Sequence, residues 1–212
     1  MRLMTKALNC VLSLILLAVA ASTQASAQES DNVSASSRDE AQTIVAQLGS
    51  RDALLRQRAA EELARRADTE QLKAVGGYRL QEKNARVRVA LDWALYRMGK
   101  NESLFALVHA LDSTEGDQSA SYLAQLDTPQ PLYIFLGHTK RGAQVRLLEV
   151  LSEIGDAETL ERIKPALESF EPTIAVAAEA ANERITTRLA QKPAEAVPSR
   201  PRSVGNGDES TP

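Results

Sequence analysis

The sequence is poor in the residues that most often carry redox and metal chemistry. In 212 residues it has one cysteine, Cys10, and two histidines, His109 and His138. A zinc or other transition-metal site needs three or four ligands, and neither histidine stands in an H-x-x-x-H or H-E-x-x-H motif. We therefore expect the protein to have no metal centre and no bound cofactor.

The short motifs of common enzyme classes are also absent. The chain has no G-x-S-x-G nucleophile elbow, no phosphate-binding P-loop and no G-x-G-x-x-G dinucleotide motif. Aromatic residues make up only 4% of the chain, and the net charge is a mild −3. The absence of these motifs argues against an enzyme of those classes. The mild negative charge argues against a general binder of nucleic acid or anionic membranes.

One apolar run stands out near the N-terminus. It is VLSLILLAVAA, residues 11–21, preceded by Arg2 and Lys6 and followed by an A-S-A tripeptide that ends at Ala27. These are the dimensions of a secretory signal peptide, and the run is short for a permanent span. We predict a signal peptide over residues 1–27, cleaved after Ala27, and a periplasmic or secreted protein. The alternative is an uncleaved anchor in the inner membrane.

Cys10 lies inside this predicted signal peptide. A lipidated cysteine would follow the apolar run at the cleavage point, so lipidation is not expected. The predicted mature chain has no cysteine, which excludes disulfides and thiol nucleophiles. It keeps 23 cationic and 28 anionic side chains, a net charge of −5.

The rest of the chain divides into three regions. Residues 28–37 are rich in serine and poor in apolar residues, which indicates a flexible leader. Residues 38–189 show helical periodicity almost throughout and are predicted to form a repeat domain. Residues 190–212 are rich in proline, glycine and charge, so we expect a disordered tail that cannot bury enough apolar surface to fold.

The middle region contains three similar segments, residues 55–68, 87–100 and 143–156. Each has apolar residues at its first, fifth and ninth positions, which form one face of a helix. These are Leu55, Ala59 and Leu63; Val87, Leu91 and Leu95; and Ala143, Leu147 and Leu151. Gly99 and Gly155 near the ends of two segments are typical helix terminators. Residues 119–126 and 173–185 are predicted to be degenerate copies.

A shorter helix is expected before each of these five segments. The predicted partner helices are residues 39–48, 69–80, 103–111, 129–137 and 157–167. Short loops between amphipathic helices force antiparallel pairs, and stacked pairs form an α-solenoid. The sequence therefore predicts an all-α fold, an α-solenoid of about five antiparallel helix pairs.

The pattern V-R-x-x-A-x-x-A-L-x-x-x-G-[D/K] resembles HEAT repeats, especially the short bacterial type that is also found in phycobilin lyases. Its best matches are residues 87–99 and 55–68, whereas the third copy has Gln144 in place of the arginine. The resemblance implies an armadillo/HEAT-like superhelix. It also implies structural roles for Arg56 and Arg88, which would pair with a loop carboxylate or cap carbonyls of the next repeat. Ligand binding by these arginines is the alternative.

Alignment of the copies defines a second line of residues, which we call the ridge. It comprises positions four, seven and eleven of each segment, off the apolar stripe. The candidate partner-binding residues on the ridge are Arg58, Glu61, Arg65, Trp93, Arg97, Arg146 and Glu149. Second helices usually line the concave face of HEAT-like arrays. An exposed Trp93 one turn before Arg97 would form a typical interface hot spot; the alternative is a Trp93 buried at the edge of the core.

These observations predict an exported protein-interaction or scaffolding module of the cell envelope. We expect a monomer that binds a protein or peptide and neither binds nucleic acid nor spans the membrane after signal cleavage. One alternative is a small-ligand-binding or lyase-type enzyme related to the phycobilin lyases. A permanent subunit of an envelope complex is another. Fold architecture by itself does not choose among activities.

Overall fold

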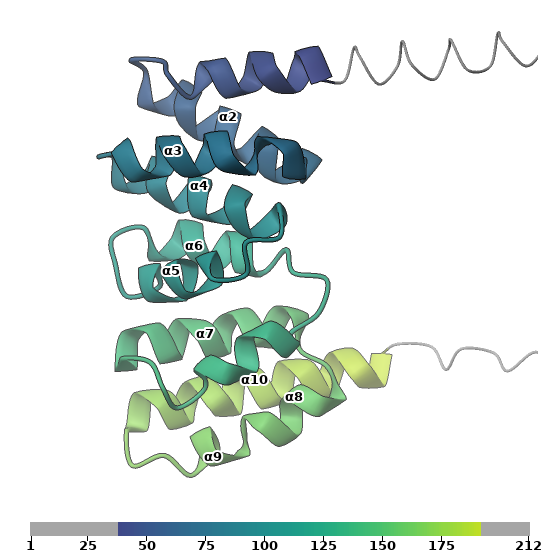
Figure 1. The fold of residues 1–212 in the computed structure, drawn as a ribbon. Helices are drawn as coiled ribbons and strands as arrows, with labels where there is room; N and C mark the ends of the chain where they lie inside the picture. Colours follow the sequence, from purple (N-terminus) through teal and green to yellow (C-terminus); the bar gives the residue numbers. More distant parts are fainter. Residues whose placement is uncertain (1–37, 192–212) are drawn as a thin grey trace, which may run out of the picture. The chain divides into compact units, whose positions relative to one another are not determined.

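Every regular element in the described part of the protein is a helix. The computed structural model describes residues 38–191, and no strand occurs in that range (Figure 1). The prediction of an all-α fold is confirmed. The predicted signal peptide and leader, and residues 192–212 of the predicted tail, lie outside the described residues. Ala190 and Gln191, which were assigned to the tail, belong to the last helix.

The chain divides into two compact units, residues 1–125 and 126–212, which we describe separately. The first unit begins with helical residues 38–47. Its further elements are α2 (Ala53–Arg66), the 3₁₀ helix η1 (Thr69–Gln71), α3 (Leu72–Gln81), α4 (Ala85–Arg97), α5 (Ser103–Ala110) and α6 (Gly116–Leu123). Helix α4 packs against α2, α3, α5 and α6 (Figure 1). The fully buried large side chains of this unit are Leu63, Leu91, Leu95, Met98, Leu107, Leu111 and Leu123.

The second unit is built around α7 and α10. Its elements are the 3₁₀ helix η2 (Gln130–Phe135), α7 (Arg141–Ile154), α8 (Ala157–Arg162), α9 (Lys164–Leu167) and α10 (Pro172–Gln191). Helix α10 packs against α7, α8 and α9, and η2 packs against α8. The core of this unit contains Leu132, Leu147, Leu148, Leu151 and Ile163.

The apolar stripes of the three predicted segments form the core, with one exception. Eight of the nine stripe residues are at most 3% exposed. Leu55 is 39% exposed, so the expectation that it is buried is wrong. It lies in the first turn of α2, and the buried face of that helix begins one turn later, at Ala59.

Two of the predicted partner helices have a different local structure. The segment 129–137 forms a 3₁₀ helix rather than an α-helix. Two prolines, Pro129 and Pro131, lack the N–H groups that an α-helix would use there. The segment 157–167 is divided into α8 and α9, with Pro165 in the first turn of α9.

Side-chain caps explain where several helices begin. Asp52 accepts a hydrogen bond from the N–H of Leu54 at the start of α2, and Asn84 accepts one from Val87 at the start of α4. Asp156 and Thr159 form a reciprocal capping box at α8. Each cap satisfies N–H groups that have no partner within their helix.

The helix ends use two different geometries. Gly99 has a φ of +97°, and the N–H of Lys100 donates to the carbonyl of Leu95, as in a Schellman motif. Gly155 ends α7 in extended backbone, with φ −62° and ψ 154°. A Cβ atom there would lie 2.4 Å from the carbonyl oxygen of Leu151 and 2.8 Å from Cδ1 of Ile185. Gly155 is therefore required by close packing and not by a left-handed conformation.

No helix in residues 38–191 is both long and apolar enough to cross a membrane.

Candidate interaction site

Four of the predicted ridge residues line one pocket in the first unit. The pocket has a volume of about 480 Å³ and is formed by three helices, α2, α4 and α6. Its lining residues are Glu61, Ala64, Arg65, Trp93, Arg97, Tyr122 and Gln125. Arg58 is exposed on α2 and does not line it. The ridge register thus brings together charged and aromatic side chains from successive helices of the pattern.

Trp93 forms the aromatic floor of this pocket. Its side chain is only 4% exposed, so the exposed arrangement considered for it is wrong and the core-edge alternative describes its position. The indole stacks on Tyr122 with ring centroids 5.7 Å apart and on Tyr96 with centroids 5.9 Å apart. It is buried because Tyr122 and Tyr96, which lie off the core stripe, cover it.

Arg97 lies over the indole as the i, i+4 spacing suggested. Its Cζ atom is 5.6 Å from the centroid of the Trp93 ring, within the range of a cation–π contact. Arg65, the second arginine of the pocket lining, donates to Glu62 through Nη2 and Nε, and its side chain is 72% exposed. The pocket therefore combines an aromatic floor with two arginines.

A hydrogen-bond network fixes the acidic side of the pocket. The Tyr122 hydroxyl donates to Oε1 of Glu61 at 2.6 Å and accepts from Nε2 of Gln118 at 2.8 Å. Gln57 donates to the same Glu61 oxygen. Burial raises the pKa of Tyr122 well above its usual range, and the hydrogen bond to Glu61 adds to the shift. Tyr122 is thus a fixed, neutral donor that orients Glu61.

Tyr122 and Gln125 are not among the predicted site residues. Both lie in residues 119–126, a predicted degenerate copy of the repeat. With Leu123 at the ninth position, the ridge positions of this segment are Gln118, Ser121 and Gln125, so the register finds Gln125 but not Tyr122. Tyr122 is recognised as a site residue only through its stack on Trp93 in the structure.

The two remaining ridge residues lie in the second unit. Glu149 is exposed on α7 and lines a second, mainly apolar pocket of about 470 Å³ between α7 and α10. The walls of this pocket include Val145, Val176 and Ala177. Arg146 is half-buried on α7 and does not line it. In both units, the seventh ridge position therefore borders a hollow between consecutive second helices.

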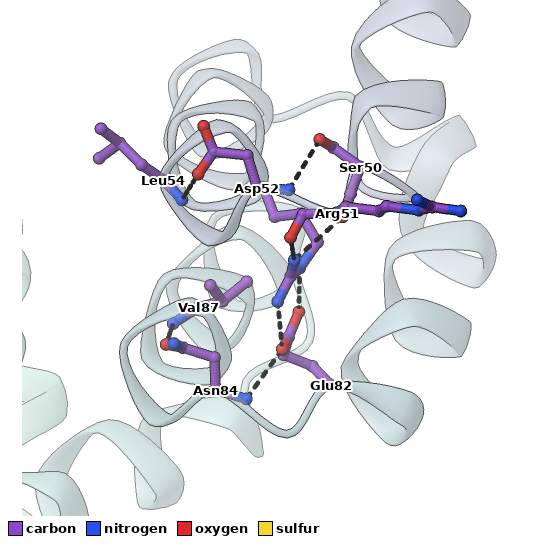
Figure 2. A network of polar contacts seen from close by, with 8 residues as sticks. Ser50, Arg51, Asp52, Leu54, Glu82, Asn84 and Val87 are labelled. Carbon is purple, nitrogen blue, oxygen red and sulfur yellow. Dashed lines mark hydrogen bonds and ion pairs between the residues drawn. The ribbon is translucent and has the colours of Figure 1, made fainter.

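Arg56 joins two segments of the first unit, and its acceptors Ser50, Arg51 and Glu82 are labelled in Figure 2. Its Nε and Nη2 donate to the two oxygens of Glu82, at 2.7 and 2.9 Å, and its Nη1 donates to the carbonyls of Ser50 and Arg51. Glu82 also accepts a hydrogen bond from the N–H of Asn84. The hydrogen bond from Arg56 lowers the pKa of Glu82 and outweighs the opposing effect of burial.

Arg88, at the same repeat position on α4, has no such contact. Its side chain is exposed and forms no hydrogen bond or ion pair with the residues that the structure describes. His109 and His138 are also exposed. Within residues 38–191, no group of three or more histidine, cysteine, aspartate or glutamate residues could hold a metal ion.

No protein-family model matches the chain, and no curated protein matches it. The residues of the site therefore have to support any functional assignment by themselves.

Proposed function

We propose that the chain is an exported HEAT-like repeat protein that acts as a protein-interaction or scaffolding module in the cell envelope. Its partner, a protein or peptide, would bind the face formed by α2, α4 and α6. Export rests on the signal-like N-terminal sequence, and the repeat assignment rests on the sequence pattern of residues 55–68 and 87–99.

The packing order within each unit supports a solenoid of helix pairs. In the first unit, the second helices of the pattern follow one another, since α2 contacts α4 and α4 contacts α6. Helices α3 and α5 pack against the second helix that follows each of them. In the second unit, η2 contacts α8 and α7 contacts α10. Contacts between neighbouring repeats are the organising feature of solenoids.

One observation carries the proposed binding face: ridge positions of two successive second helices, together with a tyrosine of α6, line a single pocket. Glu61 and Arg65 come from α2, Trp93 and Arg97 from α4, and Tyr122 from α6. A site assembled from equivalent positions of successive repeats extends along the array, which suits an elongated protein or peptide surface.

The chemistry of the pocket fits a protein hot spot. Tryptophan, tyrosine and arginine are the residues that most often dominate the energy of protein interfaces. Trp93 and Tyr122 are already held in a stack, so little side-chain entropy is lost when a partner covers them. Arg65 and Arg97 at the pocket favour a partner with an acidic or carbonyl-rich segment.

The test uses substitutions that leave the buried stack intact. The tagged chain would be expressed in its own host, gently crosslinked and purified from the envelope fraction, and the captured partner identified and produced. The affinity of that partner would then be measured for the double variant R65A/R97A. We expect a loss of at least about tenfold, which corresponds to the ~1.4 kcal/mol of a modest hot spot.

The matched control is R86A/R88A, which removes two exposed arginines of α4 outside the pocket. We expect this variant to bind as the wild type does. Equal affinity for R65A/R97A and wild type would contradict the proposed face. The absence of any stoichiometric partner, with the protein recovered free, would contradict the interaction function itself.

A further inference from the structure

The helices α2 and α7 begin at the same position of the repeat but with opposite chemistry. Asp52 precedes α2, and Arg56 is its fourth residue; Lys140 and Gln144 stand at the equivalent positions of α7. The backbone is extended at both capping residues, with φ and ψ of −78° and 117° at Asp52 and −62° and 155° at Lys140. An anion is thus replaced by a cation, and a cation by a neutral amide, on similar backbone.

This replacement leaves the start of α7 without an acceptor. Asp52 caps α2 through its carboxylate, whereas no side chain caps α7 and its first turn contains no acidic residue. The positive end of the helix dipole therefore adds to the charges of Lys140 and Arg141. A helix start of this kind favours an external oxyanion, which can accept hydrogen bonds from the first N–H groups.

The replacement also leaves space. A pocket of about 510 Å³ lies at the start of α7, entirely within the second unit. Its polar lining comes from Thr139, Arg141, Gln144, Arg162, Ser169 and Glu171. Its apolar wall includes Leu136, Pro165 and Ile174. The pocket is far larger than a water molecule or a simple ion, and its apolar wall suits an organic ligand.

Two buried polar groups in this pocket have no partner. Gln144 is 7% exposed, and its side-chain amide forms no hydrogen bond with any residue that the structure describes. The hydroxyl oxygen of Thr139 is fully buried and is also without a hydrogen bond there. Buried polar groups are nearly always paired with protein, water or ligand. Of the two, Gln144 is the group that a molecule in the pocket can satisfy, because its side chain lines the pocket.

The charged residues of the pocket favour an anion. Two arginines line it, against one carboxylate, Glu171. Glu171 is already paired with Arg141, at 3.1 Å, and both side chains are about half exposed or more. Arg162 is paired with Glu158 and lies over the ring of Tyr133. Exposed pairs of this kind are weak and leave the arginines available to a stronger, bidentate acceptor.

We propose that the pocket at the start of α7 binds the carboxylate of a small organic acid or of a peptide C-terminus. The carboxylate accepts hydrogen bonds from the first N–H groups of α7, the Gln144 amide and Arg141. The organic part of the ligand lies against Leu136 and Ile174. This site is separate from the pocket on α2, α4 and α6, and it stands whether or not the proposed partner binding does.

The probe is N-acetyl-leucine, which has a free carboxylate and an apolar side chain, and its matched control is N-acetyl-leucinamide. Binding to the full chain would be followed by the ¹⁵N NMR signal of the Gln144 side-chain amide. We expect saturable shifts with the acid and at least about a tenfold weaker response to the amide. Inorganic phosphate should bind more weakly than the acid, because it leaves the apolar wall uncovered.

The decisive variant is K140D, which places the capping residue of α2 at the start of α7. Its carboxylate should cap α7 internally, raise the melting temperature and abolish binding of the probe, so that loss of binding cannot result from unfolding. K73D makes the same charge change on an exposed residue of α3 and should bind as the wild type does.

Two results would overturn the proposal: equal binding of the acid and the amide, or a K140D variant that binds the acid as well as the wild type. A tripeptide with a free C-terminus distinguishes the two ligand sources. Tighter binding of the tripeptide than of N-acetyl-leucine would assign the site to peptide termini, and tighter binding of N-acetyl-leucine would assign it to a small organic acid.

Discussion

The guanidinium of Arg56 and the carboxylate of Glu82 form a bidentate ion pair between α2 and the loop that connects α3 to α4. The two side chains are 18% and 7% exposed. Arg56 also holds the chain before its own helix through the carbonyls of Ser50 and Arg51 (Figure 2). Planar, two-pronged donation to a carboxylate is the geometry that arginine provides and lysine does not. The ion pair therefore holds α2 against the loop between α3 and α4.

Replacing Glu82 by glutamine should destabilise the first unit in a pH-dependent way. Arg56 holds the pKa of Glu82 below its unfolded value of about 4.3. A lowered pKa stabilises the fold above the unfolded value, and this contribution disappears as the pH falls through the folded value. We expect E82Q to be about 2 kcal/mol less stable at pH 7 and the gap to narrow at pH 3.

Urea unfolding followed by tryptophan fluorescence measures this gap, because Trp93 is the only tryptophan and lies in the first unit. The control is E62Q, which removes a more exposed partner of Arg65 and Arg66 and should cost less than about 1 kcal/mol. A gap between E82Q and wild type that does not change from pH 7 to pH 3 would show that the ion pair does not contribute in this way.

The indole of Trp93 should be essential for folding rather than for recognition alone. Its burial predicts that W93A loses about 3–5 kcal/mol, whereas W93F, which keeps a ring in the stack, loses less. R97A should cost less than W93A, because it leaves the buried indole in its stack. Thermal unfolding followed by circular dichroism ranks the three variants. If W93A melted like the wild type, the buried position of Trp93 would be wrong.

The helices could be predicted from the sequence because their apolar stripes are continuous. The segments 55–68, 87–100 and 143–156 begin two residues after α2, α4 and α7 do, and their last residues form the helix ends. The prediction was less accurate where proline controls the backbone, at η2 and at the division between α8 and α9. Leu55 was misplaced because a stripe shows which face is apolar and not how far its burial extends.

The candidate site could be predicted only in part, for a reason that Trp93 illustrates. The register correctly grouped Trp93 with Glu61, Arg65 and Arg97, since all four line one pocket. It could not show that Tyr122, on a weak copy of the repeat, would cover the indole. The pocket at the start of α7 lies where Gln144 stands in place of the arginine of the other two copies. The sequence shows this replacement, but only the structure shows the space beside it.

Glycines of this protein should respond in opposite ways to the same substitution. At Gly155, an added Cβ would meet the backbone of Leu151 and the side chain of Ile185, so G155A should cost about 2 kcal/mol through overpacking. At Gly76, inside α3, an added Cβ would meet no atom within 4 Å beyond the backbone of its own helix, and G76A should stabilise the helix by about 0.5–1 kcal/mol. Limited proteolysis with mapped cleavage sites separates the two effects, because the first falls in the second unit and the other in the first. Faster cleavage of G76A than of wild type would contradict this account.

Replacing Ala67 by glycine should stabilise the C-terminal end of α2. Ala67 is the one non-glycine residue of the described chain with a positive φ, 52°, and its N–H donates to the carbonyl of Leu63. A side chain in this left-handed conformation is strained by its Cβ, which glycine lacks. We expect A67G to stabilise the first unit by about 0.5–1 kcal/mol, despite the greater freedom of glycine in the unfolded chain. The reverse change at the end of α4, G99A, should destabilise the first unit by about 1 kcal/mol, because Gly99 has a φ of +97°, which a side chain rarely adopts. No clash adds to this strain, since the space around the Cβ position is open. Urea unfolding of both variants by Trp93 fluorescence gives the two signs directly, and a destabilised A67G would show that entropy in the unfolded chain outweighs the strain at this helix end.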